Sequence, residues 1–160
     1  MTTVALNKQV VEPKWNTTKI QEEVARTHSM LYLTAMNFVA KHGGEKGVEE
    51  FQTEMRNHKV EHYKKLGVKT PLDLVKAMAE FEVNVFGSKV EISGDDHKAE
   101  LKYNSCAMWN AMKTFGHLNT QQEEQMGRSF DMCMQNLAKE FGFKGESKFE
   151  GEVCVLSFTK

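Results

Sequence analysis

The pattern of apolar and polar positions predicts three helices in the first half of the chain. The first begins at Asn16 or Thr17, polar residues that can cap a helix, and runs to the glycine pair Gly43-Gly44. Its stretch MLYLTAMNFVA is apolar on nearly every side, which predicts contacts with several neighbours. The apolar positions at helical spacing are Ile20, Val24, Leu31, Ala35 and Phe38.

Two further helices follow the glycine pair. The second ends at Gly67, and the third opens with Thr70 as its N-cap, has Pro71 in its first turn and ends at Gly87. Because two histidines fall on the apolar stripe of the second helix, both are expected to face inward. That stripe consists of Val48, Phe51, Met55, His58, His62 and Leu66.

The second half of the chain mixes strands with helices. The segments KVEIS and AELKY alternate apolar with polar residues around the turn SGDDHK, which predicts a β-hairpin. A short helix, CAMWNAMKTF, and a longer amphipathic one after Asn119 follow, and ESKFEG and EVCVLSF form two more strands. The predicted fold class is α+β, with helices packed on a small antiparallel sheet and a helical N-terminal half.

The predicted organisation is an arm over residues 1–15, followed by a single domain over residues 16–160. Two roles for the arm remain open: it is mobile, or it packs on a neighbouring subunit and so supports a homo-oligomer.

Charge and composition narrow the classes of partner. With 21 basic and 22 acidic side chains the formal net charge is −1, so we expect neither nucleic acid nor a membrane surface as a partner. The N-terminal residues MTTVALNKQVVEPKW lack a signal-like apolar run, which predicts a cytoplasmic protein. The three cysteines form no CxxC pair, so we expect reduced thiols.

His58 and His62 lie one helical turn apart, so their imidazoles could share a metal ion or a substrate. With Glu61 the string HKVEH also matches H-x-x-E-H, a zinc-peptidase motif, although nothing else in the chain resembles those enzymes. The alternative is that both histidines are packed and hydrogen-bonded in a polar seam of the core.

Cys106 follows a strand and begins a helix, where backbone N–H groups and the helix dipole favour a nucleophilic thiolate. The alternative is a small buried side chain at a corner. Cys133 and Cys154 could face the same seam, so a zinc or iron site that combines thiolates with His58 and His62 is conceivable.

Two further residues are candidates for substrate binding. His28 falls near the inner face of the first helix, where it could supply a third imidazole or a general base, unless it is a satisfied core histidine. Trp109 lies in the short helix that Cys106 opens.

The chain from roughly Val48 to Lys160 resembles the family of L-2-amino-thiazoline-4-carboxylic acid hydrolases, which are akin to 4-vinyl reductase-like small-molecule-binding domains. The segments that carry the resemblance are HYKKLGVKTPLDLVKAMAEFE, NSCAMWNAMKTFG, FDMCMQNLAKEFGFKGE and GEVCVLSF. Ala107 stands where the family usually has proline. The resemblance implies hydrolytic opening of a cyclic amidine or thiazoline C–N bond at Cys106, Cys133 and Cys154, and related domains hold zinc through cysteines.

Two functions therefore compete. In the first, a small-molecule hydrolase uses a cysteine nucleophile or a metal-activated water to attack a polarised C=N carbon. In the second, a non-catalytic module binds a small organic molecule or a metal and acts as a sensor. A purely structural role ranks third.

Overall fold

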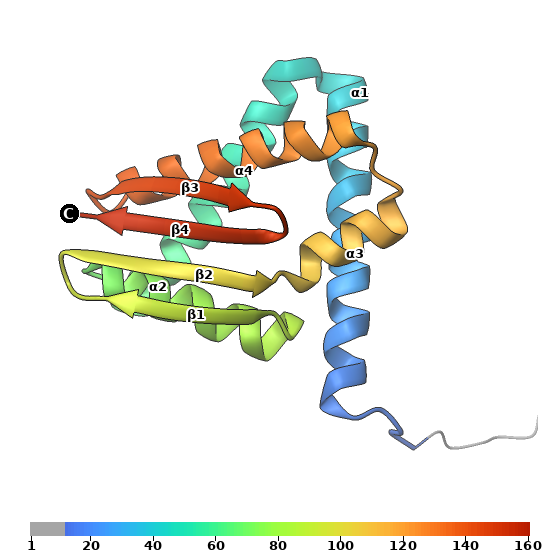
Figure 1. Ribbon diagram of the computed structural model, residues 1–160. Coiled ribbons are helices and arrows are strands. Elements are labelled where there is room, and N and C mark those ends of the chain that lie inside the picture. Colours follow the sequence, from blue (N-terminus) through green and yellow to red (C-terminus); the bar gives the residue numbers. More distant parts are fainter. Residues whose placement is uncertain (1–11) are drawn as a thin grey trace, which may run out of the picture.

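The computed structural model describes residues 12–160, and it confirms the predicted α+β class: helices pack on a four-stranded antiparallel sheet (Figure 1). Of the predicted arm, residues 1–11 lie outside the described residues, so its role stays a prediction. The elements in chain order are α1 (Thr17–Lys65), α2 (Pro71–Phe81), the π-helix η1 (Glu82–Phe86), β1 (Lys89–Gly94), β2 (Lys98–Ser105), α3 (Ala107–Gly116), α4 (Thr120–Lys139), β3 (Lys144–Glu150) and β4 (Val153–Thr159).

Helix α1 is a hairpin of two helical arms. Gly44 interrupts it with φ 60° and ψ −155°, a backbone conformation that glycine adopts without steric cost. The first arm covers residues 17–43, and the second covers residues 45–65 and turns back obliquely from the first toward the sheet (Figure 1). The predicted break at the glycine pair is therefore confirmed. Asn16 caps the first arm by accepting a hydrogen bond from the Lys19 backbone N–H at 2.9 Å.

The next helix begins as its sequence predicts. The Thr70 hydroxyl accepts from the Asp73 N–H, and the Asp73 carboxylate accepts from the Thr70 N–H, so a capping box precedes the turn that holds Pro71. The last residues before Gly87 differ from the prediction, because α2 widens there into the π-helix η1.

The sheet has the strand order β1-β2-β4-β3, so β2 and β4 are its central strands. Leu101 pairs with Leu156 and Tyr103 with Cys154 across these two strands. Helices α2 and α4 cover one face of the sheet (Figure 1). The opposite face carries charged side chains, including an ion pair of Lys102 with Glu91 at 3.7 Å.

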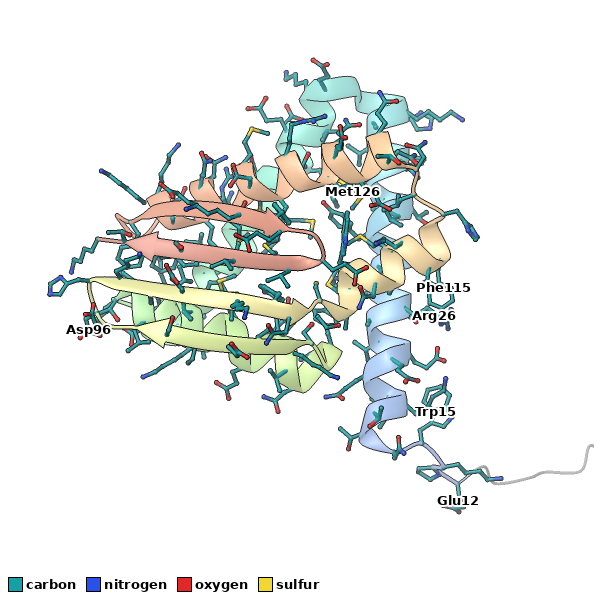
Figure 2. The ribbon with its side chains drawn as sticks, in the orientation of Figure 1. Glu12, Trp15, Arg26, Asp96, Phe115 and Met126 are labelled. Atoms are coloured by element: carbon teal, nitrogen blue, oxygen red, sulfur yellow. The ribbon has the colours of Figure 1, made fainter. Side chains whose placement is uncertain are left out.

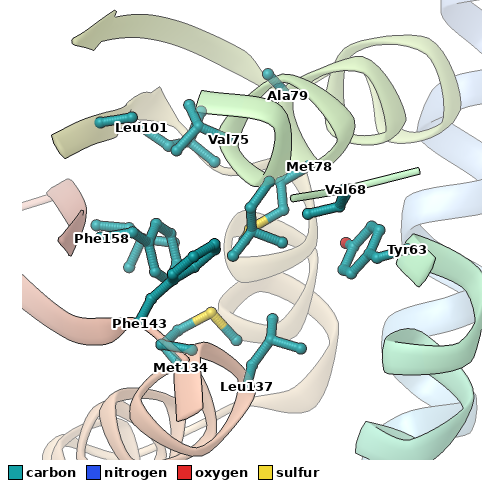
Figure 3. Packing of buried hydrophobic residues seen from close by; sticks show 14 of the residues in the cluster. Tyr63, Val68, Val75, Met78, Ala79, Leu101, Met134, Leu137, Phe143 and Phe158 are labelled. Carbon is teal, nitrogen blue, oxygen red and sulfur yellow. The ribbon is translucent and has the colours of Figure 1, made fainter. Parts of the chain in front are cut away.

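The core lies between the sheet and these two helices, and the second arm of α1 closes it at one side (Figure 3). Tyr63 and Val68 enter the cluster beside Met78 and Leu137. Each fully buried aliphatic or phenyl side chain contributes about 1.5–3 kcal/mol to stability. The largest fully buried apolar side chains are Phe158, Leu74, Leu101, Leu137, Leu156 and Val75.

In the part of the chain that the structure describes, none of the helices has an apolar stretch that could cross a bilayer.

Candidate functional site

The strongest concentration of buried reactive groups lies where η1, the end of β2 and the start of α3 meet. We call it the acid–thiol cluster, and it consists of Glu82, Ser88, Tyr103, Cys106 and Cys154. Ser88, Tyr103 and Cys154 are buried, and Glu82 and Cys106 are half-buried. The cluster draws on segments that are far apart in the sequence but adjacent in the fold.

The π-helix η1 places the carboxyl group of this cluster. Its backbone carbonyls at Val83 and Asn84 accept hydrogen bonds from the Gln21 side-chain amide on α1, at 2.9 and 3.1 Å. Gly87 ends the π-helix with φ 72°, and a Cβ atom there would meet the Gln21 Oε1 atom at 2.9 Å. The Ser88 N–H then donates to the Glu82 carbonyl at 3.1 Å, which folds Ser88 back over the turn. Such widened turns occur frequently at functional sites.

A chain of hydrogen bonds joins this turn to the start of α3. The Ser88 hydroxyl donates to Glu82 Oε2 at 2.7 Å, and the Ala107 N–H donates to the Ser88 Oγ at 3.1 Å. The preceding residue, Cys106, is the N-cap of α3, and its Sγ accepts from the Trp109 N–H at 3.5 Å. The carboxyl of Glu82 and the thiol of Cys106 are thus anchored to the same helix terminus.

The titration behaviour of the cluster follows from its burial. Desolvation raises the pKa of Glu82, and hydrogen bonds from Ser88 and Tyr103 together with the charge of Lys59 oppose that rise. Desolvation likewise raises the pKa of Cys106 to about 11 against the hydrogen bond from the Trp109 N–H, and the nearby Glu82 charge adds to the rise. Burial and the neighbouring Cys106 raise the pKa of Cys154 to about 12. Both thiols are therefore protonated at neutral pH.

Two basic side chains from the two arms of α1 flank the cluster. Desolvation lowers the pKa of His28, and the charge of Lys59 lowers it further; the same charge opposes the rise in the pKa of Glu82 that desolvation causes. The His28 ring lies 5.3 Å from the ring of Phe86, the last residue of η1. His28, predicted to bind substrate, therefore stands beside the cluster with an exposed side chain rather than inside the core.

The predicted inward histidine pair is wrong. His58 and His62 are both exposed on the second arm of α1. The buried side of this arm runs instead through Val60 and Tyr63, so the inward face is rotated away from the predicted stripe. Glu61 does not serve the histidines either, because its carboxylate pairs with Lys65 at 2.8 Å.

The cysteines are brought together only in part. The charge of Cys106 adds to desolvation in raising the pKa of Cys154, so these two thiols lie in one cluster. Cys133, half-buried on α4, instead adds to the desolvation that raises the pKa of Tyr32 on α1. Across residues 12–160 no group of three or more His, Cys, Asp or Glu side chains is placed to hold a metal ion. The predicted ligand set of His58, His62, Cys106, Cys133 and Cys154 is therefore not assembled.

Trp109, the other predicted substrate-binding residue, contributes through its backbone, since its N–H binds the Cys106 sulfur. The residue that sequence reasoning missed is Glu82. Its signal was its position, four residues after Met78 and eight after Leu74, where the buried stripe of α2 continues into η1.

No protein-family model matches this chain, and no curated protein matches it either.

Proposed function

We propose that the acid–thiol cluster is the active site of a small-molecule hydrolase that opens a cyclic amidine or thiazoline C–N bond, with Cys106 as nucleophile and Glu82 as proton carrier. The observation that carries the proposal is the hydrogen-bonded link from Glu82 through Ser88 to the start of α3, where Cys106 caps the helix. A thiol whose pKa is about 11 needs a base nearby before it can attack. A carboxylate with a raised pKa is a stronger base than an ordinary one.

The reaction balances without an added co-reactant other than water. The Cys106 proton passes to Glu82, the sulfur adds to the C=N carbon of the amidine, and Glu82 returns the proton to the ring nitrogen, which becomes an N–H. The C–N bond then breaks as the second amidine nitrogen forms a C=NH bond to the same carbon, and the proton that this nitrogen loses passes through Glu82 to the ring nitrogen, which leaves as an amine. Water adds to the resulting thioimidate carbon and gives one proton to the imine nitrogen. A carbonyl forms as the Cys106 sulfur leaves, and the second proton of the water passes through Glu82 to that sulfur.

The remaining groups have supporting roles in this proposal. Lys59 and His28 stand beside the cluster, where His28 would contact the substrate. The half-buried Trp109 would cover the substrate ring. The three cysteines are free thiols, which supports a reducing, cytoplasmic location.

A second function, non-catalytic binding of a small organic molecule, is favoured by one observation. Burial raises the pKa of Cys106 and Cys154 to about 11 and about 12, so the resting cluster presents neutral thiols rather than a nucleophile. Such a surface suits a ligand that is captured but not converted.

One experiment separates the two functions. Purified protein is incubated with 2-amino-thiazoline-4-carboxylate and other cyclic amidines, and ring opening is followed by mass spectrometry alongside metal analysis of the same sample. The hydrolase proposal expects turnover that Cys106→Ser abolishes and Glu82→Gln lowers at least about 100-fold. The matched controls Cys133→Ser and His58→Ala are expected to keep full activity, because neither residue belongs to the cluster.

Binding of a cyclic amidine in calorimetry without ring opening would instead establish the binding module. The absence of both turnover and binding would overturn the assignment of this cluster. Full activity of Cys106→Ser would overturn it as well.

A further inference from the structure

One face of the first arm of α1 makes hydrogen bonds to both elements that carry the acid–thiol cluster. Gln21, Ala25 and Ser29 follow one another at intervals of four residues, so they lie on one face of the helix. Ala25 and Ser29 are buried, and Gln21 is half-buried. Arg26, by contrast, is exposed and lies on the side of the arm away from the sheet (Figure 2). The arm therefore turns its buried face toward η1 and α3.

Gln21 holds the element that carries Glu82. Its side-chain amide donates to the carbonyls of Val83 and Asn84 in η1 at 2.9 and 3.1 Å. Carbonyl groups in the last turn of a helix lack partners within that helix, so the amide supplies what the π-helix itself does not. Gly87 fits against this side chain, because a Cβ atom there would meet Gln21 Cβ and Cδ at 3.3 Å. The contact fixes where η1 lies relative to the arm.

Ser29 reaches the thiol through a single peptide group. Its hydroxyl donates to the Met108 carbonyl at 3.1 Å, and the N–H of the same peptide group, that of Trp109, donates to the Cys106 Sγ at 3.5 Å. A hydrogen bond accepted by a peptide carbonyl polarises the N–H of that peptide and strengthens its donation. Ser29 is fully buried, so its hydroxyl is kept from water and stays on this carbonyl.

We propose that the face from Gln21 to Ser29 is a positioning element that holds the Glu82 carboxyl and the Cys106 thiol at a fixed separation. The two hydrogen-bonding positions are eight residues, or about 12 Å, apart on one continuous helix. Neither η1 nor α3 can therefore shift along the arm without breaking a hydrogen bond. The role of this face rests on the proposed function, in which Glu82 carries the proton of Cys106. Gln21 and Ser29 act through η1 and α3 rather than on the substrate.

The two positioning residues influence the thiol with opposite sign. The titratable groups that face Cys106 are Glu82 from η1, Tyr103 from β2 and Cys154 from β4. Burial raises the pKa of Tyr103 and Cys154, which keep their protons in weakly alkaline solution, so Glu82 is the charged one of the three. Burial also raises the pKa of Cys106, the Trp109 N–H opposes that rise, and the charge of Glu82 adds to it. Displacing Glu82 should therefore make the thiol more acidic, and weakening the N–H should make it less acidic.

The rate at which iodoacetamide alkylates Cys106 at about pH 8.5, followed by mass spectrometry, tests both contacts. Gln21→Met keeps the length of the side chain but has no donor. Releasing η1 takes the Glu82 charge from the thiol, so Cys106 should react about 3-fold faster or more. Ser29→Ala removes the donor that polarises the peptide bound to the thiol, so Cys106 should react about 2-fold slower or more. Loosened packing alone would make both variants react faster.

Two further measurements separate positioning from a general loosening of the fold. Cys133, a half-buried thiol on α4, is alkylated in the same samples and should keep its wild-type rate in both variants. In a Glu82→Gln background, Gln21→Met should no longer change the rate at Cys106, because no charge is left to displace.

The matched controls make the same chemical changes elsewhere. Gln125→Met alters an exposed position of α4, and Ser157→Ala removes a hydroxyl on β4 that donates to Glu100 at 3.1 Å. Both should leave the alkylation rate of Cys106 unchanged.

The alkylation rates require no turnover, so failure of the positioning role and failure of the proposed function are distinguishable. If the protein does turn over a cyclic amidine, Gln21→Met should lower kcat about 10-fold with KM unchanged, and a change in KM alone would contradict the role. An unchanged rate at Cys106 in either variant, faster reaction in both, or equal changes at Cys106 and Cys133 would overturn it. So would a Gln21→Met effect that persists beside Glu82→Gln.

Discussion

Large apolar side chains are buried in the sheet layer but exposed on the first arm of α1. Phe158 on β4 is fully buried, whereas Phe38 on the first arm is 64% exposed. The strand is paired on both sides and covered by helices on one face, whereas Phe38 points outward from a helix that packs against α3, η1 and α4. Burial in this protein is decided by the number of elements that face a residue, and not by its hydrophobicity alone.

Replacing the two phenylalanines tests that comparison with the largest expected effect. Phe158→Ala should lower the free energy of unfolding by about 3–5 kcal/mol, because it leaves a cavity in the core. Phe38→Ala should lower it by less than about 1 kcal/mol, since the ring is 64% exposed and packs beside the exposed His42 ring, at 4.4 Å between centroids. Urea denaturation of both variants at low protein concentration gives the two values. Equal losses would contradict the contrast between the regions.

The acid–thiol cluster, unlike the exposed side of the first arm, depends on buried hydrogen bonds. Ser88→Ala removes the donor to Glu82 and the acceptor for the Ala107 N–H, so it should cost about 1–3 kcal/mol. Ser93→Ala, on an exposed position of β1, is the matched control and should stay within about 0.5 kcal/mol. Urea denaturation again measures the free energy of unfolding. A Ser88→Ala variant as stable as wild type would show that the hydrogen bonds through Ser88 do not hold the turn after η1.

Glu82 gives stability a pH dependence of known sign. Its pKa is raised in the folded protein, so the folded state holds the proton more tightly than the unfolded chain does. The stabilisation is complete below the ordinary pKa of a carboxyl group and is lost as the pH rises through the raised value. Glu82→Gln stays neutral, so the variant should gain stability relative to wild type between pH 4 and pH 7.

The measurement is the free energy of unfolding of both proteins across that range. Glu80→Gln, which changes an exposed residue two positions earlier near the end of α2, should show no such trend. A stability difference between wild type and Glu82→Gln that is flat with pH would mean that Glu82 is ionised alike in both states.

The smallest effect is expected at Leu31 on the first arm of α1. Leu31→Gln keeps helix propensity nearly constant, and the side chain is 66% exposed, so the free energy of unfolding should change by about 0.5 kcal/mol or less in urea denaturation. A loss above about 2 kcal/mol would show that Leu31 is covered within the chain.

The local features of the fold were predictable because a motif of a few consecutive residues predicts each of them. Gly44 breaks α1 where the glycine pair stands, and Thr70 with Pro71 opens α2 as the capping pattern requires. The predicted hairpin over β1 and β2 is confirmed by its antiparallel register. These signals work without knowledge of the rest of the chain.

The candidate site was harder to predict because it depends on helical phase and on distant pairing. The second arm of α1 offers two neighbouring stripes, and packing buries Val60 and Tyr63 instead of His58 and His62. The π-helix that turns Glu82 toward Ser88 rests on Gln21, sixty-two and sixty-three residues from the carbonyls it binds. Cys154 reaches the cluster only because β4 pairs with β2. The apolar segment MLYLTAMNFVA predicted contacts on several sides, yet Leu31 and Phe38 are exposed.

The strand order β1-β2-β4-β3 also bears on how the chain is made. Strand β4 comes later in the sequence than both strands between which it inserts. On the ribosome, therefore, β2 and β3 are synthesised before the strand that joins them, and each has a free hydrogen-bonding edge until β4 emerges. The four-stranded sheet can therefore be completed only after the last of its strands has been synthesised.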